Sequence, residues 1–219
     1  MNNFKRSPRL VKGGIVQIDP GTSAVQRIIT LQYNPDSLSR TLQVQGMGGE
    51  SGDRSEALRL KGPPVETLKL DVEIDASDQL EFPDQNPATV ELGIYPQLAA
   101  LETLIYPSSA QLQSNNSLAQ SGTLEITPMQ APLTLFIWSK QRILPVRLTD
   151  FSVTEEAFDP QLNPIRAKVS LGMRVLSIND LGFNHKGGSL YMIYQQRKEQ
   201  LVTKSIAGVL NSLDIGEIP

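Results

Sequence analysis

Three acidic residues on one side of an expected strand are the best candidates for chemistry in this chain. From Thr67 to Asp75, apolar and polar residues alternate, and the polar positions include Asp71, Glu73 and Asp75. Side chains two residues apart on a strand lie on the same face, so these carboxylates could hold a divalent cation for a metal-dependent enzyme. A solvated polar face gives the same pattern, because acids are seldom buried. We expect the solvated face, and a carboxylate-lined channel is compatible with it.

No other residue group has the spacing of a reactive site. His185 is the single histidine, and metal binding or general-base catalysis would need a second positioned group. We expect it to be a solvated loop residue. The chain has no cysteine, and its Gly46-Met-Gly-Gly49 run lacks the strand-to-helix context of a phosphate loop. We therefore expect no catalytic, cofactor-binding or metal-binding residue, no cofactor, and no enzymatic activity.

The charge of the chain gives no reason to expect binding to nucleic acid or insertion into a membrane. The formal net charge is -3, and no run of about 18 uncharged apolar residues occurs. The basic start of the chain, with Lys5, Arg6, Arg9 and Lys12, has no apolar segment typical of a secretion signal behind it. We expect these basic residues to be a solvated arm.

The chain is organised around three consecutive strands between Pro132 and Ser177. Leu133–Trp138, Arg142–Thr154 and Pro164–Ser177 are separated by short polar segments, and the third strand alternates apolar and polar residues. This pattern predicts a β-meander with one dry face. Trp138 is expected in the core or an interface rather than in a sugar-binding site.

The middle strand changes the parity of its apolar residues near Asp150. One extra residue at this point would keep both halves of the strand facing the core, which predicts a β-bulge and a curved sheet. The apolar residues on the two sides of the change are Leu144, Val146 and Leu148, then Phe151 and Val153.

Four further strands and a long polar loop are expected before the meander. The strands are Ile15–Ile18, Gln26–Tyr33, Ser39–Gln45 and Thr67–Asp75. Residues 46–64 are rich in glycine and proline and are too long for a tight turn. This segment is expected to be a mobile loop or an interaction arm.

Helical periodicity appears in two places. Ala88–Tyr106 is expected to be the one internal helix, with Pro96 splitting or kinking it, and residues 108–130 are expected to form a second polar loop. Ser189–Leu213 is expected to be a C-terminal helix with Ser189 as its N-cap. The helix either covers the sheet or reaches a partner, in which case Gly187-Gly188 would be its hinge.

Several of these segments together resemble the tube-domain family of contractile injection systems, the tube-initiator and baseplate-hub proteins of phage-tail-like particles. The similarity covers about residues 10–177, and short motifs distributed along the chain carry it. They are Leu31-Gln32-Tyr33-Asn34-Pro35, the strand from Leu68 to Ile74, the single internal helix, the strand with Phe136-Ile137-Trp138, and Asn163-Pro164-Ile165-Arg166-Ala167.

The resemblance implies a mainly β fold, a curved barrel or sandwich like that of phage tail tubes, with one internal and one C-terminal helix. Residues 1–177 would be the tube-like domain and residues 178–219 a helical extension. Copies would form a hexameric ring that joins the spike hub to the inner tube, with Leu68–Ile74 and Ile165–Val175 lining the channel. The expected partners are the chain itself, the hub, the next tube ring, and baseplate wedge or sheath-adaptor proteins.

The same resemblance implies assembly in the bacterial cytoplasm, in a particle that is either released or kept anchored. Two departures from the family pattern concern the meander: Ser139 stands where glycine is usual, and Asp159–Asn163 replaces a tighter turn. Some relatives add a LysM peptidoglycan-binding module, and nothing after Ser177 is similar to one.

Two alternatives of other classes are open from the sequence. The first is a monomeric β-barrel that binds a ligand at Trp138 or at the 46–64 loop. The second is an enzyme that uses Asp71, Glu73 and Asp75 with a divalent cation, and its activity would be lost on Asp71→Asn. Neither alternative accounts for both polar segments and the C-terminal helix.

Overall fold

A computed structural model describes residues 10–46, 59–122 and 131–205. Its centre is one seven-stranded antiparallel sheet with the order β2-β1-β5-β6-β7-β4-β3. The strands are β1 (Gly14–Ile18), β2 (Val25–Thr30), β3 (Ser39–Gln43), β4 (Val65–Asp75), β5 (Leu133–Ser139), β6 (Arg142–Phe158) and β7 (Pro164–Val175). All seven expected strands are present, with ends that shift by up to four residues.

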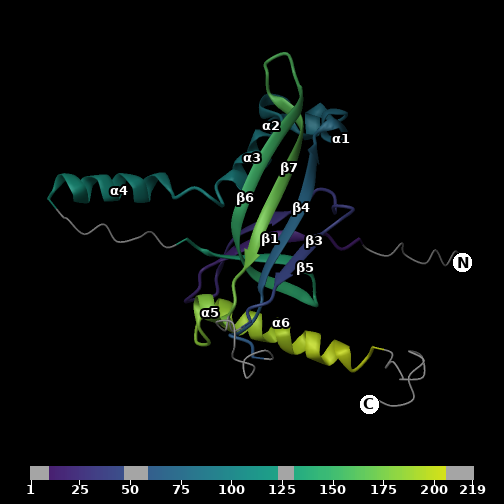
Figure 1. The fold of residues 1–219 in the computed structure, drawn as a ribbon. Helices are drawn as coiled ribbons and strands as arrows, with labels where there is room; N and C mark the ends of the chain where they lie inside the picture. The colour runs from purple at the N-terminus through teal and green to yellow at the C-terminus, as the bar shows by residue number, and fades with distance from the viewer. Residues whose placement is uncertain (1–9, 47–58, 123–130, 206–219) are drawn as a thin grey trace, which may run out of the picture.

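The predicted meander of β5, β6 and β7 is confirmed, and β6 has two neighbours in succession. Residues 142–146 of β6 pair with β5, and from Val146 onward the strand pairs with β7. The long β6–β7 hairpin rises well above the rest of the sheet (Figure 1). The half of β6 from Arg147 to Phe158, here called distal β6, has no strand on its other side in the described part of the chain.

The predicted bulge in β6 is also confirmed. Leu148 lies opposite Met173 and Asp150 lies opposite Gly172, so Thr149 is the extra residue. Leu148, Phe151 and Val153 all pack against the same hydrophobic cluster. The extra residue therefore does what the change in parity requires, because it returns the second half of the strand to the core side.

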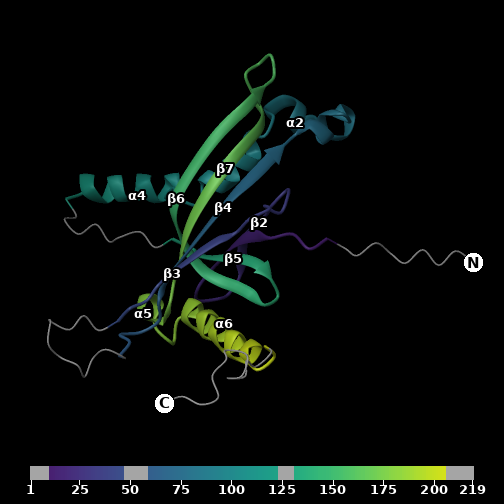
Figure 2. The same ribbon diagram turned by 45° about the vertical axis from the view of Figure 1, so that its right-hand side comes forward.

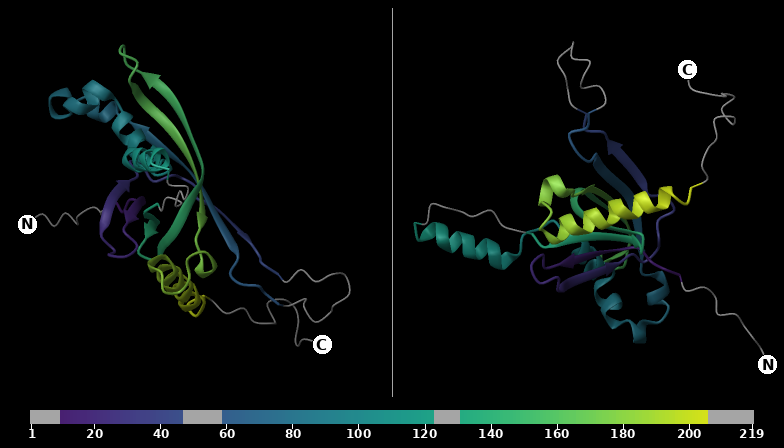
Figure 3. Two further views of the ribbon diagram at one scale, coloured as in Figure 1. Left: turned by 90° about the vertical axis from the view of Figure 1, so that its left-hand side faces the viewer. Right: turned by 90° about the horizontal axis from the view of Figure 1, so that it is seen from below.

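Of the barrel or strongly curved sheet that was expected, the described residues form a strongly twisted, open sheet, and a closed barrel is not observed among them. The edges of this sheet are β2 and β3, and Figures 2 and 3 show how strongly its strands are twisted relative to one another. The core lies on one face of β4 and β7, where residues at alternate positions are almost fully buried. They include Leu68, Leu70, Val72, Ala167, Val169 and Leu171.

The single internal helix predicted for Ala88–Tyr106 is instead several short helices. α2 (Pro87–Leu92) and α3 (Tyr95–Glu102) are separated by Gly93, and α1 (Ser77–Leu80) and a 3₁₀ helix, η2 (Pro83–Gln85), precede them. Gly93 has φ of 58°, and a Cβ there would lie 2.2 Å from the carbonyl oxygen of Pro164. The break therefore comes from a glycine that touches the start of β7, while Pro96 is tolerated in the first turn of α3.

The prediction of a loop at residues 108–130 is wrong for the first half of this segment. Ser109–Gln120 forms helix α4, which begins with a capping box between Ser108 and Gln111 and has no buried residue. It projects from the body of the molecule (Figure 1). The polar composition suggested a loop, yet the capping pair was present in the sequence. Residues 123–130 lie outside the described residues, as do residues 47–58 of the 46–64 loop.

The C-terminal helix begins earlier than predicted. α5 (Ile178–Leu181) is followed by α6 (Lys186–Val202), and the N-cap of α6 is His185, whose Nδ1 accepts a hydrogen bond of 3.0 Å from the backbone N–H of Gly187. Ser189 is therefore not the cap. Gly187 and Gly188 are buried in the first turn of the helix and are not a hinge, since a Cβ on Gly188 would lie 1.8 Å from the carbonyl oxygen of Gly182.

Of the two roles open for this helix, the described part covers the chain's own sheet. Tyr191 and Tyr194 of α6 belong to the main hydrophobic cluster of the sheet. The helix crosses beneath the sheet, at the end away from the β6–β7 hairpin tip (Figures 1 and 3). Residues 206–219, the last part of the predicted helix, lie outside the described residues. Within the described segments, no helix has both the length and the apolar character needed to cross a bilayer.

Candidate functional site

The acidic row of β4 lies on the polar face of the sheet, where β7 supplies a partner for each acid. Asp75 Oδ2 is 2.7 Å from Arg166 Nε, and Glu73 Oε1 is 4.0 Å from Lys168 Nζ. Asp71 accepts a hydrogen bond from the Ser170 hydroxyl. The expected solvated face is therefore confirmed, because the acids alternate with buried residues along β4.

This row does not have the arrangement of a metal centre. The described residues contain no group of three histidine, cysteine, aspartate or glutamate side chains that could hold an ion. Successive acids on the strand face different cross-strand partners, and two of those partners are cations. Pairing of this kind distributes the negative charge of the carboxylates among separate partners along the sheet, and it does not concentrate that charge at one point.

Asp75 is the acid of the row with a perturbed pKa. Hydrogen bonds from Ser77 hold the pKa of this carboxyl below its usual value of 3.8, and Arg166 adds to the effect while partial burial opposes it. The Ser77 backbone N–H donates to Asp75 Oδ1 at 2.7 Å. Asp75 thus fastens the end of β4 both to the start of α1 and to β7, which is a structural role.

A polar hollow of about 650 Å³ lies on the same face beside the bulge. Asp150 lies across Gly172, where a Cβ would be 2.5 Å from Asp150 Oδ2. The Thr149 hydroxyl donates to the same carboxylate at 3.0 Å. The other residues of the lining include Lys69, Asp71, Ser152 and Ser170. The hollow therefore carries mixed charge and hydroxyl groups, with no histidine or cysteine.

A second, apolar groove of about 370 Å³ lies between β2, β4 and α3. Two contacts join its walls. The Gln32 side chain bonds both backbone groups of Asp75, with Nε2 2.6 Å from the carbonyl oxygen and Oε1 3.0 Å from the N–H. Arg27 of β2 donates to the Ala100 carbonyl oxygen at 3.3 Å and to the Thr103 hydroxyl of the segment after α3.

Sequence reasoning missed the groove because nothing in the composition of β2 marks it. Gln32 was part of the motif Leu31-Gln32-Tyr33-Asn34-Pro35, but no property of a glutamine in sequence says that its amide will bond a distant strand. Two of the lining residues, Ile28 and Thr30, are exposed in the structure.

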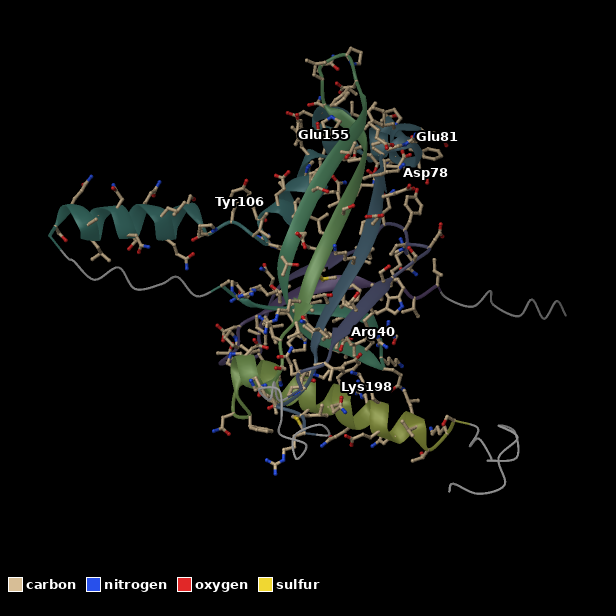
Figure 4. All side chains as sticks on the ribbon, viewed as in Figure 1. Arg40, Asp78, Glu81, Tyr106, Glu155 and Lys198 are labelled. Carbon is tan, nitrogen blue, oxygen red and sulfur yellow. The ribbon has the colours of Figure 1, made fainter. Side chains whose placement is uncertain are left out.

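Glu66 is a second feature that sequence reasoning missed. Its side chain is only 3% exposed, and it lies 3.7 Å from Arg40 Nε and 3.5 Å from Lys198 Nζ. The Tyr194 hydroxyl donates to Glu66 at 3.2 Å, and the Lys198 ammonium lies over the Tyr194 ring. Arg40 and Lys198 approach this cluster from the sheet and from α6 (Figure 4). The sequence contained a signal for this burial, because Glu66 is at one of the alternate positions of β4 that face the core.

Burial and charge in this cluster act on the pKa of its members. Desolvation lowers the pKa of the Lys198 ammonium, and Glu66 partly opposes that effect. Desolvation and the charge of Glu66 both raise the pKa of the Tyr194 hydroxyl, which keeps it as a proton donor. The cluster is a polar clamp between α6 and the sheet.

The other residues singled out in the sequence make structural contacts. Trp138 is partly buried and stacks on Phe136 with ring centroids 5.9 Å apart, so its expected place in the core is confirmed. His185 lies at the end of the loop between α5 and α6, as expected, but it is half-buried there and caps α6, so it is not simply solvated. Lys12 bonds the carbonyl oxygen of Gln32 at 2.8 Å, while Lys5, Arg6 and Arg9 lie outside the described residues.

Two stretches of strand edge, on β3 and on distal β6, have no partner strand in the described part of the chain. β3 pairs only with β4, and distal β6 pairs only with β7. Glu155 marks distal β6 near the top of Figure 4, and Arg40 marks β3 near its base. Unpaired edges of this length present rows of N–H and C=O groups that other strands can bind.

No protein-family model matches the chain, and no curated protein matches it. Function is therefore argued from the surfaces described above.

Proposed function

We propose that this chain is a structural component of a contractile injection system, a baseplate or tube-initiator protein that forms a hexameric ring joining the spike hub to the inner tube. The resemblance of residues 10–177 suggests this role. The observation that carries it is the four-stranded part of the sheet that has two open edges and a polar face opposite the core.

The four strands are β3, β4, β7 and distal β6, in that order across the sheet. Neighbouring strands are antiparallel, so the two edges run in opposite directions. Rotation about a ring axis keeps the direction of each strand. The joint between β3 of one copy and distal β6 of the next would therefore be antiparallel, and a full circle would leave no open edge in this part of the sheet.

The free backbone groups at both edges follow from the ladders. The backbone N–H and C=O of Asp75 point away from β7. Backbone groups alternate in direction along a strand, so the N–H and C=O of Thr67 and Lys69 point to the same side as those of Asp75, toward β3. The backbone N–H and C=O of Arg40 and Leu42 in β3 consequently point away from β4, toward the open edge. The same reasoning applies to distal β6. It starts from the 2.9 Å hydrogen bond between the Ala76 N–H and the Ile165 carbonyl oxygen, and it leaves the backbone groups of Phe151 and Val153 pointing away from β7.

The face of this sheet opposite the core suits a water-filled channel. Its charges alternate and are paired, as in Asp75 with Arg166 and Lys168 with Glu156 at 3.3 Å. A lining of this kind would offer a passing protein neither an apolar patch nor a field of one sign. The channel strands proposed from the sequence, Leu68–Ile74 and Ile165–Val175, are the middle of this sheet.

The partners we propose are further copies of the chain, the spike hub, the next tube ring, and wedge or sheath-adaptor proteins. The particle would be assembled in the bacterial cytoplasm. Helix α4 projects without a packed face and is a candidate arm for contact with a neighbour. The cation-dependent enzyme has no support in the paired acids, and the ligand-binding barrel has none in Trp138.

The experiment that tests the ring uses a proline at the outer edge. Leu42→Pro removes an outward N–H of β3 and leaves the bonds to β4 intact, whereas Leu42→Thr keeps that N–H. We expect rings of the unchanged protein in native mass spectrometry and electron microscopy, in the presence of the hub protein if needed. Leu42→Pro should abolish them and Leu42→Thr should not.

A compact monomer under all of these conditions would contradict the proposal. Rings that survive Leu42→Pro would contradict the joint at β3. The first outcome makes the monomeric ligand-binding module the better hypothesis, whereas the second means that the ring is closed by another surface.

A further inference from the structure

The apolar groove between β2, β4 and α3 has the features of a site for an extended peptide. We propose that it binds one β-strand of a partner protein, uncharged and with aliphatic residues at alternate positions, which pairs with the open edge of β2. This edge differs from the two edges assigned to the ring. The inference therefore does not depend on ring formation.

The backbone of β2 is oriented for such pairing. The Leu31 N–H donates to the Gly13 carbonyl oxygen at 3.0 Å, so Leu31 faces β1. Backbone groups alternate in direction along a strand, which makes Ile29 face β1 and leaves Ile28 and Thr30 facing away. Both of these residues line the groove, and no described strand lies on that side of β2.

A polar atom in the wall of the groove also lacks a partner. Gln97 Oε1 is buried and accepts no hydrogen bond from the residues that the structure describes. Buried acceptors are nearly always satisfied, because an unmade hydrogen bond costs about 1–3 kcal/mol. An N–H group of a bound segment would satisfy this oxygen. The unpaired edge of β2 and the unpaired Gln97 Oε1 of α3 are independent observations. An occupant that forms hydrogen bonds would satisfy both.

The lining decides the chemistry of that occupant. Its residues are aliphatic or neutral, and the two cations that contact lining residues have partners already: Arg27 bonds Ala100 and Thr103, and Lys12 bonds the carbonyl oxygen of Gln32. A charged side chain would lose its hydration there without gaining a counter-ion. Strand addition beside a pocket is a common mode of peptide recognition, in which main-chain hydrogen bonds give affinity and the pocket selects every second side chain.

The contacts at Gln32 and Arg27 make the groove a ready site. Gln32 holds β2 to the end of β4, and Arg27 holds it to α3, so both walls are fixed before anything binds. A fixed site loses less conformational entropy on binding than a flexible one. The exposed side chains of Val25 and Ile28 extend the apolar surface beyond the groove.

The test uses the full chain and a synthetic peptide, acetyl-KTVTVTK-amide, whose lysines would lie outside the groove. Its control is the same peptide with N-methyl groups on the amides of one edge, which removes hydrogen bonds and keeps the side chains. Binding is followed through backbone NMR shifts. We expect shifts at Ile28, Thr30 and Gln97 and at least about tenfold weaker binding of the methylated peptide.

Two variants locate the site. Thr30→Pro removes an outward N–H without removing a bond to β1, and it should weaken binding while Thr30→Val should not. Ala100→Phe fills the groove and should abolish binding. Circular dichroism of each variant shows whether it is folded.

Three outcomes would overturn the proposal. The first is absence of binding, and the second is equal binding of both peptides, which would mean an apolar pocket for small ligands. The third is dissociation of an oligomer of the chain alone by Thr30→Pro, which would mean that a second copy occupies the groove. Failure of the ring experiment has no bearing on these results.

Discussion

Gly172 and Asp150 occupy facing positions of β7 and β6, and only one of them can have a side chain pointing into the space they share. A Cβ on Gly172 would lie 2.5 Å from Asp150 Oδ2 and 2.8 Å from Asp150 Cβ. The bulge at Thr149 brings the carboxylate to this place. The glycine is therefore a consequence of the bulge.

Gly172→Ala should lower the free energy of unfolding by about 1–3 kcal/mol, because the added methyl group overpacks this contact. Chemical denaturation measures the change. Adding Asp150→Gly, which removes the Cβ as well as the carboxylate, to Gly172→Ala should recover most of the loss, and Gly46→Ala, which meets no atom within 4 Å, should have little effect. Equal losses in the single and double variants would mean that the clash is not the cause.

The lowered pKa of Asp75 makes the stability of the protein depend on acidity. Its pKa in the folded chain is below the usual 3.8, so the stabilisation is complete above that value and is lost as the pH falls through the folded pKa. Unfolding measured between about pH 5 and pH 2 should show this loss. Asp75→Asn should flatten that part of the profile, and Asp36→Asn is the control. An unchanged profile would contradict the assignment.

Periodicity alone predicted the polar row and the bulge, since both follow from which residues must face the core. It did not predict what the polar residues contact. Asp71 and Ser170, or Gln32 and Asp75, meet only after distant strands are placed. The same limit applies to the groove, whose walls come from three separate elements.

At the scale of elements, α6 is held to the sheet by apolar packing and by the clamp at Glu66. The carboxylate faces two cations, and both are about one-third exposed, with side-chain exposures of 37% for Arg40 and 32% for Lys198. Solvent therefore screens part of the attraction. The nearly complete burial of Glu66 still makes its removal costly, because the hydroxyl of Tyr194 also depends on it.

Glu66→Gln should destabilise the protein by about 1–3 kcal/mol, since two cations would lose their counter-ion while part of the hydration remains. The loss should appear as faster proteolysis within α6 and a lower unfolding temperature. Glu199→Gln, on the exposed side of the same helix, is the matched control. Similar effects of the two substitutions would argue against a clamp.

Elements were predicted best where their residues follow a clear pattern. The strands β4 and β7 follow from apolar alternation, and their centres were placed correctly. Helix α4 has no apolar face, so only the capping pair Ser108 and Gln111 could have revealed it. The start of α6 was missed because two glycines usually end a helix, yet here they allow the close approach to Gly182.

For the whole molecule, a ring joined by two different edges predicts complementation between variants. Leu42→Pro blocks β3 and leaves distal β6 free, while Val153→Pro blocks distal β6 and leaves β3 free. Each variant alone should be monomeric, and an equal mixture should give a dimer with one joint. Sedimentation velocity distinguishes these states. A mixture that stays monomeric, or either variant forming rings alone, would contradict the two-edge joint.

The succession of two partners along β6 has a mechanical consequence. Its first residues pair with β5 and the rest with β7, so one unbroken backbone connects the two halves of the sheet. Tension applied along this strand acts perpendicular to its ladder bonds. The bonds would then carry the load in shear, many at a time, whereas a pull across the strand would open them one after another. The fold is thus built to resist force along the long hairpin far better than force that peels it sideways.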